Sequence, residues 1–73
     1  NIFPNPIEDN FHITTNEING LFELYNNLGQ KVKSTNLTSN KTMITRGNLK
    51  QGIYFYKISK KGIRLDMGKI LFR

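Results

Sequence analysis

The chain has 73 residues, a formal net charge of +6, one histidine and no cysteine. A chain of this length makes one small domain and buries only about 60% of the surface that its unfolded state exposes, so a thin core is expected. The absence of cysteine excludes disulfides and thiolate metal sites, and it leaves the compartment undecided.

An extended entry segment is predicted at the N-terminus. Pro4 and Pro6 flank Asn5, and each proline lacks a ladder donor and holds the residue before it in an extended conformation. Residues 2–7 are therefore interpreted as a stiff entry segment or a sheet edge. Residues 11–15 alternate between apolar and polar side chains, which predicts a first strand.

A hairpin is predicted in the next part of the chain. Residues 19–20 are an Asn-Gly turn dipeptide, because both residue types tolerate a positive φ. Residues 21–25 then predict a second strand, residues 26–30 a turn, and residues 31–34 a shorter strand that pairs with the second one. The polar residues 35–41 predict a loop.

The longest predicted strand lies within residues 49–59, after a weaker strand at residues 42–45. A polar turn with Gly52 leads into β-branched and aromatic residues, which is typical of a strand. Its side chains alternate between two faces, Tyr54, Tyr56 and Ile58 on one and Ile53, Phe55 and Lys57 on the other. Since both faces begin apolar, we expect this strand to be central in its sheet.

Two more strands are predicted at the end of the chain. Residues 60–62 predict a turn, residues 63–65 a short strand, and residues 66–68 (Asp-Met-Gly) another turn. Residues 69–73 are the last predicted strand, with apolar side chains on one face and charged ends on the other. About seven short strands separated by turn signals, without a sustained helical period, predict an all-β sandwich or barrel.

Few residues offer catalytic chemistry. His12 lies on the outward side of a predicted strand and is interpreted as a surface residue. Glu8 and Asp9 are adjacent, so in a strand they point to opposite faces and form no carboxylate pair. A serine beside a base, a phosphate-binding glycine loop and a zinc-ligand spacing are all missing from the sequence. We therefore expect no enzymatic activity, no metal and no cofactor.

The charge is divided unevenly along the chain. Residues 1–30 contain four acids and no lysine or arginine, whereas residues 31–73 contain all eleven basic residues and one acid, Asp66. This asymmetry suggests an anionic partner, such as nucleic acid, a lipid head group or an acidic protein, or it is a solvated basic face. The aromatic residues 54–56 beside lysines leave two alternatives open: a small barrel that binds single-stranded nucleic acid, or a carbohydrate-binding or adhesion sandwich. The competing interpretation places these aromatic residues in the core.

Five segments together resemble one family. They are Ile2-Phe3-Pro4-Asn5-Pro6, Phe11-His12-Ile13, residues 22–32 (FELYNNLGQKV), residues 49–58 (LKQGIYFYKI) and the closing Lys69-Ile70-Leu71-Phe72-Arg73. Their order and separation are similar to those of the type A C-terminal sorting domain of the type IX secretion system. The resemblance departs at the turn before Gly52, where the family often has proline, and at Arg73, where it often has lysine.

The resemblance implies an immunoglobulin-like antiparallel β-sandwich of about seven short strands without catalytic activity. Residues 1–73 would be a single sorting domain, a fragment from the C-terminal end of a larger exported precursor. It would direct the preceding cargo through the periplasm to the outer-membrane translocon. A sortase-like peptidase at the cell surface would then remove it, leaving the cargo at the surface or in the medium. No nucleic acid partner and no transmembrane segment are implied.

The resemblance also assigns roles to individual residues. The structural motif would comprise Pro4, Asn5, Pro6, Gly29, Gly52 and Tyr54, with Gly29 supplying a positive φ in the hairpin turn. The candidate translocon contacts would be Lys69, Ile70, Leu71, Phe72 and Arg73.

Overall fold

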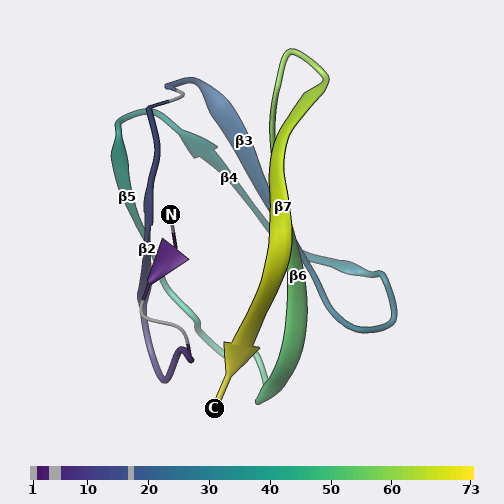
Figure 1. Ribbon diagram of the computed structural model, residues 1–73. Coiled ribbons are helices and arrows are strands. Elements are labelled where there is room, and N and C mark those ends of the chain that lie inside the picture. Colours follow the sequence, from purple (N-terminus) through teal and green to yellow (C-terminus); the bar gives the residue numbers. More distant parts are fainter. Residues whose placement is uncertain (1, 4–5, 17) are drawn as a thin grey trace.

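A computed structural model describes residues 2–3, 6–16 and 18–73 of the chain, with the side chain of Phe3 left out of the description. The fold of these residues is all-β, with two sheets packed face to face (Figure 1). The strands are β1 (Ile2–Phe3), β2 (Phe11–Thr14), β3 (Gly20–Tyr25), β4 (Lys31–Leu37), β5 (Lys41–Ile44), β6 (Gly52–Lys60) and β7 (Ile63–Phe72). The predicted β-sandwich is confirmed.

The smaller sheet has the strand order β1-β2-β5, and all its pairings are antiparallel. In its register Ile13 pairs with Ile2 on one side and with Thr42 on the other, and Phe11 pairs with Ile44. The short β1 lies at the edge of this sheet, which agrees with the edge interpretation of the entry segment. Pro4 and Asn5 lie outside the described residues.

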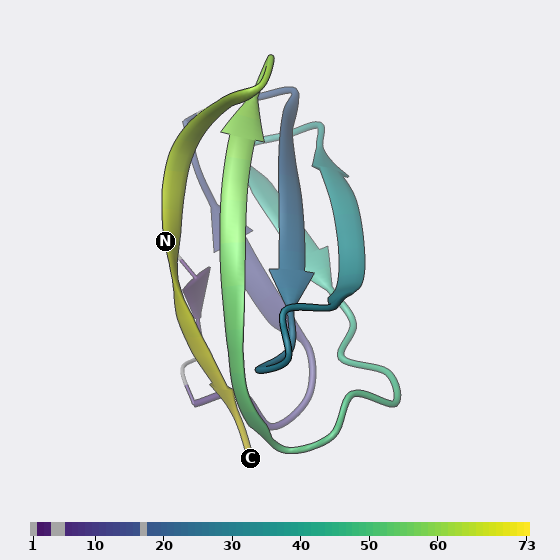
Figure 2. The same ribbon diagram turned by 90° about the vertical axis from the view of Figure 1, so that its right-hand side faces the viewer.

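The larger sheet has the strand order β4-β3-β6-β7, also with antiparallel pairings throughout. Figure 2 shows this sheet in front of the smaller one, with β7 along its margin. Leu24 of β3 pairs with Tyr56 of β6, and Tyr54 of β6 pairs with Ile70 of β7. Strand β6 thus has a partner on each side, so its predicted central position is confirmed.

Connections between the two sheets give the fold its immunoglobulin-like topology. The chain forms hairpins at β3-β4 and β6-β7, and it crosses from one sheet to the other at β2-β3, β4-β5 and β5-β6. The hairpin turn between β3 and β4 contains Gly29 with a φ of 82°, a conformation that glycine adopts without steric cost. The Asn26 side chain accepts backbone hydrogen bonds from Leu28 and Gln30 and closes this turn.

The core lies between the sheets and is built from alternate residues of strands in both of them. Phe11 of the smaller sheet contacts Phe22 and Phe72 of the larger one, with ring centroids 6.1 and 5.8 Å apart. The buried apolar residues are Ile7, Phe11, Ile13, Phe22, Leu24, Leu37, Ile44, Tyr54, Ile58, Ile70 and Phe72. Tyr54 and Ile58 therefore face the core as predicted, and Tyr56 packs against it half-buried.

Tyr54 makes a tyrosine corner at the start of β6. Its ring is buried against Phe72, with centroids 4.7 Å apart, and its hydroxyl donates a 2.8 Å hydrogen bond to the carbonyl oxygen of Lys50. Immunoglobulin-like domains hold the corresponding loop in this way, with a tyrosine that bonds back to the chain a few residues upstream. Gly52, between the two residues, has a φ of 140°, which side-chain-bearing residues rarely adopt.

Two predicted interruptions of strands are wrong. Residues 66–68 are not a turn, because β7 runs through them from Ile63 to Phe72. Gly68 lies opposite Tyr56, and a Cβ atom at Gly68 would stand 2.8 Å from the Tyr56 ring. The glycine is required here for the close approach of an aromatic ring, as glycines inside strands often are.

The predicted loop at residues 35–41 is also partly wrong. Strand β4 continues to Leu37, whose side chain is fully buried. Thr35 and Asn36 pair with Phe22 and Leu21 of β3, so these polar residues form part of a strand that faces solvent on one side.

Candidate functional site

The proposed contact residues 69–73 divide between the core and the surface. Ile70 and Phe72 are each 1% exposed and fill the core, whereas Lys69, Leu71 and Arg73 are exposed. The alternation expected of a strand produces this division. A partner that meets the folded domain can therefore contact three of the five predicted residues directly.

The end of β7 is held by a segment from the other end of the chain. The amide of Ile7 donates to the carbonyl oxygen of Leu71 at 2.7 Å, and the amide of Arg73 donates to that of Ile7 at 2.8 Å. These bonds make a parallel bridge between Ile7 and Phe72, both of which are buried. The entry segment thus pairs with β2 through β1 and, four residues later, with β7.

Arg46 holds the same corner through its guanidinium group. Its Nη1 donates to the carbonyl oxygens of Glu8 at 2.8 Å and Arg73 at 2.6 Å, and its Nε donates to that of Leu49 at 2.9 Å. The guanidinium carbon also lies 5.1 Å from the centre of the Phe72 ring. A planar group with several fixed donors can join three chain segments in this way, which a lysine cannot do.

No pattern in the sequence predicts the roles of Arg46 and Ile7. Arg46 counts only as one of eleven basic residues, and Ile7 follows a proline pair without a strand pattern around it. Their partners lie far away in the sequence, so local sequence patterns do not predict these contacts.

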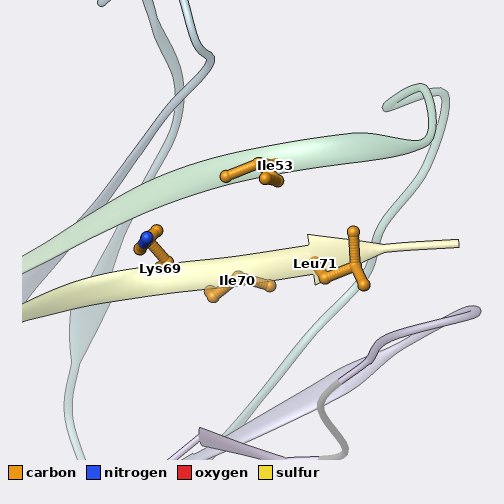
Figure 3. Close-up of a pocket in the computed structure, with 4 residues that line it drawn as sticks. All are labelled: Ile53, Lys69, Ile70 and Leu71. Atoms are coloured by element: carbon orange, nitrogen blue, oxygen red, sulfur yellow. The ribbon is translucent and has the colours of Figure 1, made fainter.

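The outer face of β6 and β7 carries exposed apolar side chains. Ile53 and Phe55 of β6 are 51% and 42% exposed, and Leu71 of β7 is 40% exposed. Ile53 pairs with Leu71 and Phe55 with Lys69 in the register of the two strands. A surface pocket between them is lined by Ile53, Lys69, Ile70 and Leu71 (Figure 3). Apolar side chains beside a lysine thus line a depression at the C-terminal strand.

The outer face also holds a carboxylate whose charge is compensated. Glu23 is 8% exposed, and its carboxylate oxygens lie 3.2 Å from the Lys31 ammonium and 3.6 Å from that of Lys57. The hydrogen bond from Lys31 lowers the pKa of Glu23, burial opposes this, and the charge of Lys57 adds to the lowering. Lys57 also lies 5.9 Å from the centre of the Tyr25 ring. This carboxylate therefore adds little negative potential to the face.

The aromatic residues that suggested nucleic-acid binding or carbohydrate binding and adhesion mostly pack against other side chains. Tyr54 is buried, and Tyr56 is half-buried against Phe22, with ring centroids 6.1 Å apart. On the outer face Phe55 is exposed, and Tyr25 is half-buried near Lys57. A row of stacking platforms, as single-strand-binding barrels use, is therefore not present in the described part of the chain.

The remaining predicted residues do not assemble into a chemical centre. His12 is half-buried on β2, where it pairs with Phe3 and Met43 in the sheet register. Across residues 2–3, 6–16 and 18–73, no three His, Cys, Asp or Glu side chains are grouped so that they could hold a metal ion. These ranges also contain no helix long and apolar enough to cross a membrane.

Comparison with known proteins gives one match. A family model described as a secretion system C-terminal sorting domain matches residues 1–71. No curated protein and no solved structure matches the chain. The family match spans both sheets and includes most of β7.

Proposed function

Since the chain belongs to the family of type IX secretion system C-terminal sorting domains, we propose that its residues 1–73 are the non-catalytic signal of a longer exported precursor. The family makes the precursor a substrate of type IX export to the cell surface. The finer steps belong to the proposal. The domain follows a cargo domain, crosses the periplasm, contacts the outer-membrane translocon, and is cut off at the surface by a sortase-like peptidase.

The arrangement of the last strand supports a contact between the translocon and residues 69–73. Ile70 and Phe72 fix the strand in the core, while Lys69, Leu71 and Arg73 face outward from it. We propose that the translocon contacts these three exposed side chains on the folded domain. Ile70 and Phe72 contribute by holding the strand in place.

The pairing of the entry segment supports a cut before the domain rather than within it. Ile2 and Phe3 pair with β2, and Ile7 pairs with β7. A cut between these residues would separate a sheet edge from its partner strand. We therefore propose that processing occurs before Ile2, outside these paired residues.

A fusion experiment tests the function. Residues 1–73 are joined to the C-terminus of a reporter with an export signal, in a host that has the type IX system, and the reporter is measured in the periplasm and outside the cell. We expect the reporter to leave the cell. If it stays in the periplasm while a known sorting domain carries it out, the proposal fails.

The contact residues are tested by charge reversal in the same fusion. We expect Lys69→Glu with Arg73→Glu to reduce export. The control Lys41→Glu with Lys50→Glu changes the net charge equally at exposed positions outside β7, and we expect its export to stay near that of the original fusion. Exposed substitutions usually alter stability by no more than about 0.5 kcal/mol, so thermal unfolding should be similar for both variants. Equal export of the two double variants would contradict the proposed contact between the translocon and residues 69–73.

A further inference from the structure

Strand β7 has one edge that no other strand of the described chain covers along most of its length. It is the last strand in the order β4-β3-β6-β7, and its described pairings are with β6 and, at Phe72 alone, with Ile7. Figure 2 shows it along the margin of the larger sheet. Such edges present backbone donors and acceptors at strand spacing, so they can take up a strand from another chain.

The hydrogen bonds to Ile7 reveal which backbone groups point toward this edge. The Leu71 carbonyl and the Arg73 amide bond to Ile7, so odd-numbered residues here direct their backbone groups away from β6. By the same alternation, the amide and carbonyl of Lys69 and the carbonyl of Met67 point to the edge. The Met67 amide donates to the Asp66 side chain at 2.8 Å instead. The register shift opposite Ile58 and Ser59 ends this regular run toward the β6-β7 turn.

Apolar side chains lie beside the same edge on the outer face of the sheet. Met67, which pairs with Lys57 of β6, is 56% exposed, and Leu65, at the register shift, is 42% exposed. Met67 continues the exposed apolar surface of Ile53, Phe55 and Leu71, of which Ile53 and Leu71 line the pocket shown in Figure 3. A strand added at β7 would place every second side chain next to these apolar residues.

The charge around the edge is strongly positive. Residues 53–73 contain six basic residues and one acid, Asp66. The Asp66 carboxylate accepts hydrogen bonds from the Tyr56 hydroxyl at 3.2 Å and from the Met67 amide. Glu23 is compensated by Lys31 and Lys57. An approaching acidic segment would therefore meet attraction, whereas a second copy of this basic face would meet repulsion.

We propose that the edge of β7 around Lys69, together with the outer face of β6 and β7, binds an extended segment of a partner polypeptide whose side chains alternate between apolar and acidic. The segment adds a strand to the larger sheet, with backbone bonds at Lys69 and Met67 and its acidic side chains toward the lysines. This inference rests on the proposed function and names the mode of recognition and the chemistry of the partner. A lipid head group could meet the charge but offers no backbone to match the strand edge.

The backbone part is tested with a pair of substitutions in the exported fusion. Lys69→Pro and Lys69→Thr both remove the charge, but only proline removes the edge amide, and proline is tolerated in edge strands where the amide points away from the sheet. We expect the proline variant to be exported about three- to tenfold less efficiently than the threonine variant, which corresponds to the loss of one hydrogen bond. If the proline and threonine variants have equal thermal stability and are exported equally, the proposal that a partner strand pairs with β7 is overturned.

A second measurement applies if the proline variant does not fold. A photoreactive amino acid is placed at Met67 in one fusion and at Lys41, in the other sheet, in a control. We expect export-dependent crosslinks from position 67 to a peptide with alternating apolar and acidic residues. Crosslinks to a basic peptide or to lipid, or equal crosslinking from both positions, would overturn the proposal.

The charge part is tested with Lys69→Glu against Lys41→Glu, a matched change in the smaller sheet. We expect only the Lys69 variant to lose export and crosslinking at position 67. Equal behaviour of the two variants would overturn the acidic partner. The acidic partner would also be overturned if Lys69→Pro left export unchanged and the original and Lys69→Pro fusions bound equally to phosphatidylglycerol vesicles or single-stranded DNA. Failure of the unsubstituted fusion to leave the cell would instead count against the proposed function, so the two results are distinguishable.

Discussion

The two halves of β7 differ in what surrounds them, although they belong to one continuous strand. The first half, residues 63–67, is exposed at every position. The second half contains the buried Ile70 and Phe72, pairs with Ile7 and is bonded to Arg46 at its end. One strand therefore combines a part of the core with a surface that β6 supports and that no other described strand contacts in the register. Four experiments test this difference, beginning with the largest expected effect.

Phe72→Ala should have the largest effect on stability. The Phe72 ring contacts Phe11 and Tyr54 and is 1% exposed, and removing a buried phenylalanine side chain costs about 3–5 kcal/mol. Urea denaturation of the purified domain measures the change. Met67→Ala in the exposed half is the control, with an expected change below about 0.5 kcal/mol. Similar losses in both variants would contradict the division of β7 into two halves.

Gly68→Ala should have an intermediate effect at the boundary between the halves. The added Cβ would lie 2.8 Å from the Tyr56 ring, so the half-buried ring must move. We expect a loss of about 1–3 kcal/mol in the free energy of unfolding, as for other overpacked positions.

The double variant Gly68→Ala with Tyr56→Ala provides the control for this clash. It should lose less than the sum of the two single variants, because the ring that meets the Cβ is gone. Additive losses would show that the ring does not require the glycine.

Arg46→Lys should loosen the fixed end of β7 while the net charge stays the same. A lysine cannot reproduce the guanidinium bonds to Glu8, Leu49 and Arg73. We expect a loss of about 1–2 kcal/mol, since part of this hydrogen-bond network is exposed to solvent.

Hydrogen exchange locates the effect of Arg46→Lys. The Arg73 amide, which bonds to Ile7, should exchange faster, while amides in the centre of β6 should keep more of their protection. Arg64→Lys, on the exposed half of β7, is the matched control. Unchanged exchange at Arg73 would count against a clamp by Arg46.

The smallest expected effect is on the pH dependence of stability, and it comes from Glu23 on the outer face of the larger sheet. In the folded state the pKa of Glu23 is lowered below its ordinary value, first by the hydrogen bond from Lys31. Its contribution is therefore fully present above the unfolded pKa and is lost as the pH falls through the lower folded pKa. Glu23→Gln should flatten the acid limb of a stability–pH curve, and an unchanged limb would contradict the ion pairs with Lys31 and Lys57.

Local sequence patterns predicted those parts of the fold that depend on neighbours in the chain. The alternation of Tyr54, Tyr56 and Ile58 identified the core face of β6, because side chains of a strand alternate whatever lies around it. The turn at residues 26–30 and the hairpin that it closes were also predicted, since the positive φ of Gly29 is a local requirement. The division of residues 69–73 between core and surface follows from the same alternation.

Other features could not be read from local patterns. Asp66 and Gly68, two residues apart, predict a turn because both residue types are common in turns, whereas Tyr56, the neighbour of Gly68 across the sheet, makes Gly68 a strand residue. The polar neighbours of Leu37 predict a loop, although β3 supplies their backbone partners. In both cases the deciding contact comes from a distant part of the sequence.

Residue order alone was enough to predict the strands with clear alternation, the turn at residues 26–30, the basic second half and the family of the chain, because each of these depends on residues that are close together in the sequence. The folded structure was needed to show that Ile7 and Arg46 hold the end of β7, and that β7 runs unbroken past Gly68. It also brought Ile53, Phe55 and Leu71 together beside a strand edge that no other described strand covers along most of its length. The physical reason is that hydrogen bonds between strands and packing between sheets join residues that are far apart in the chain.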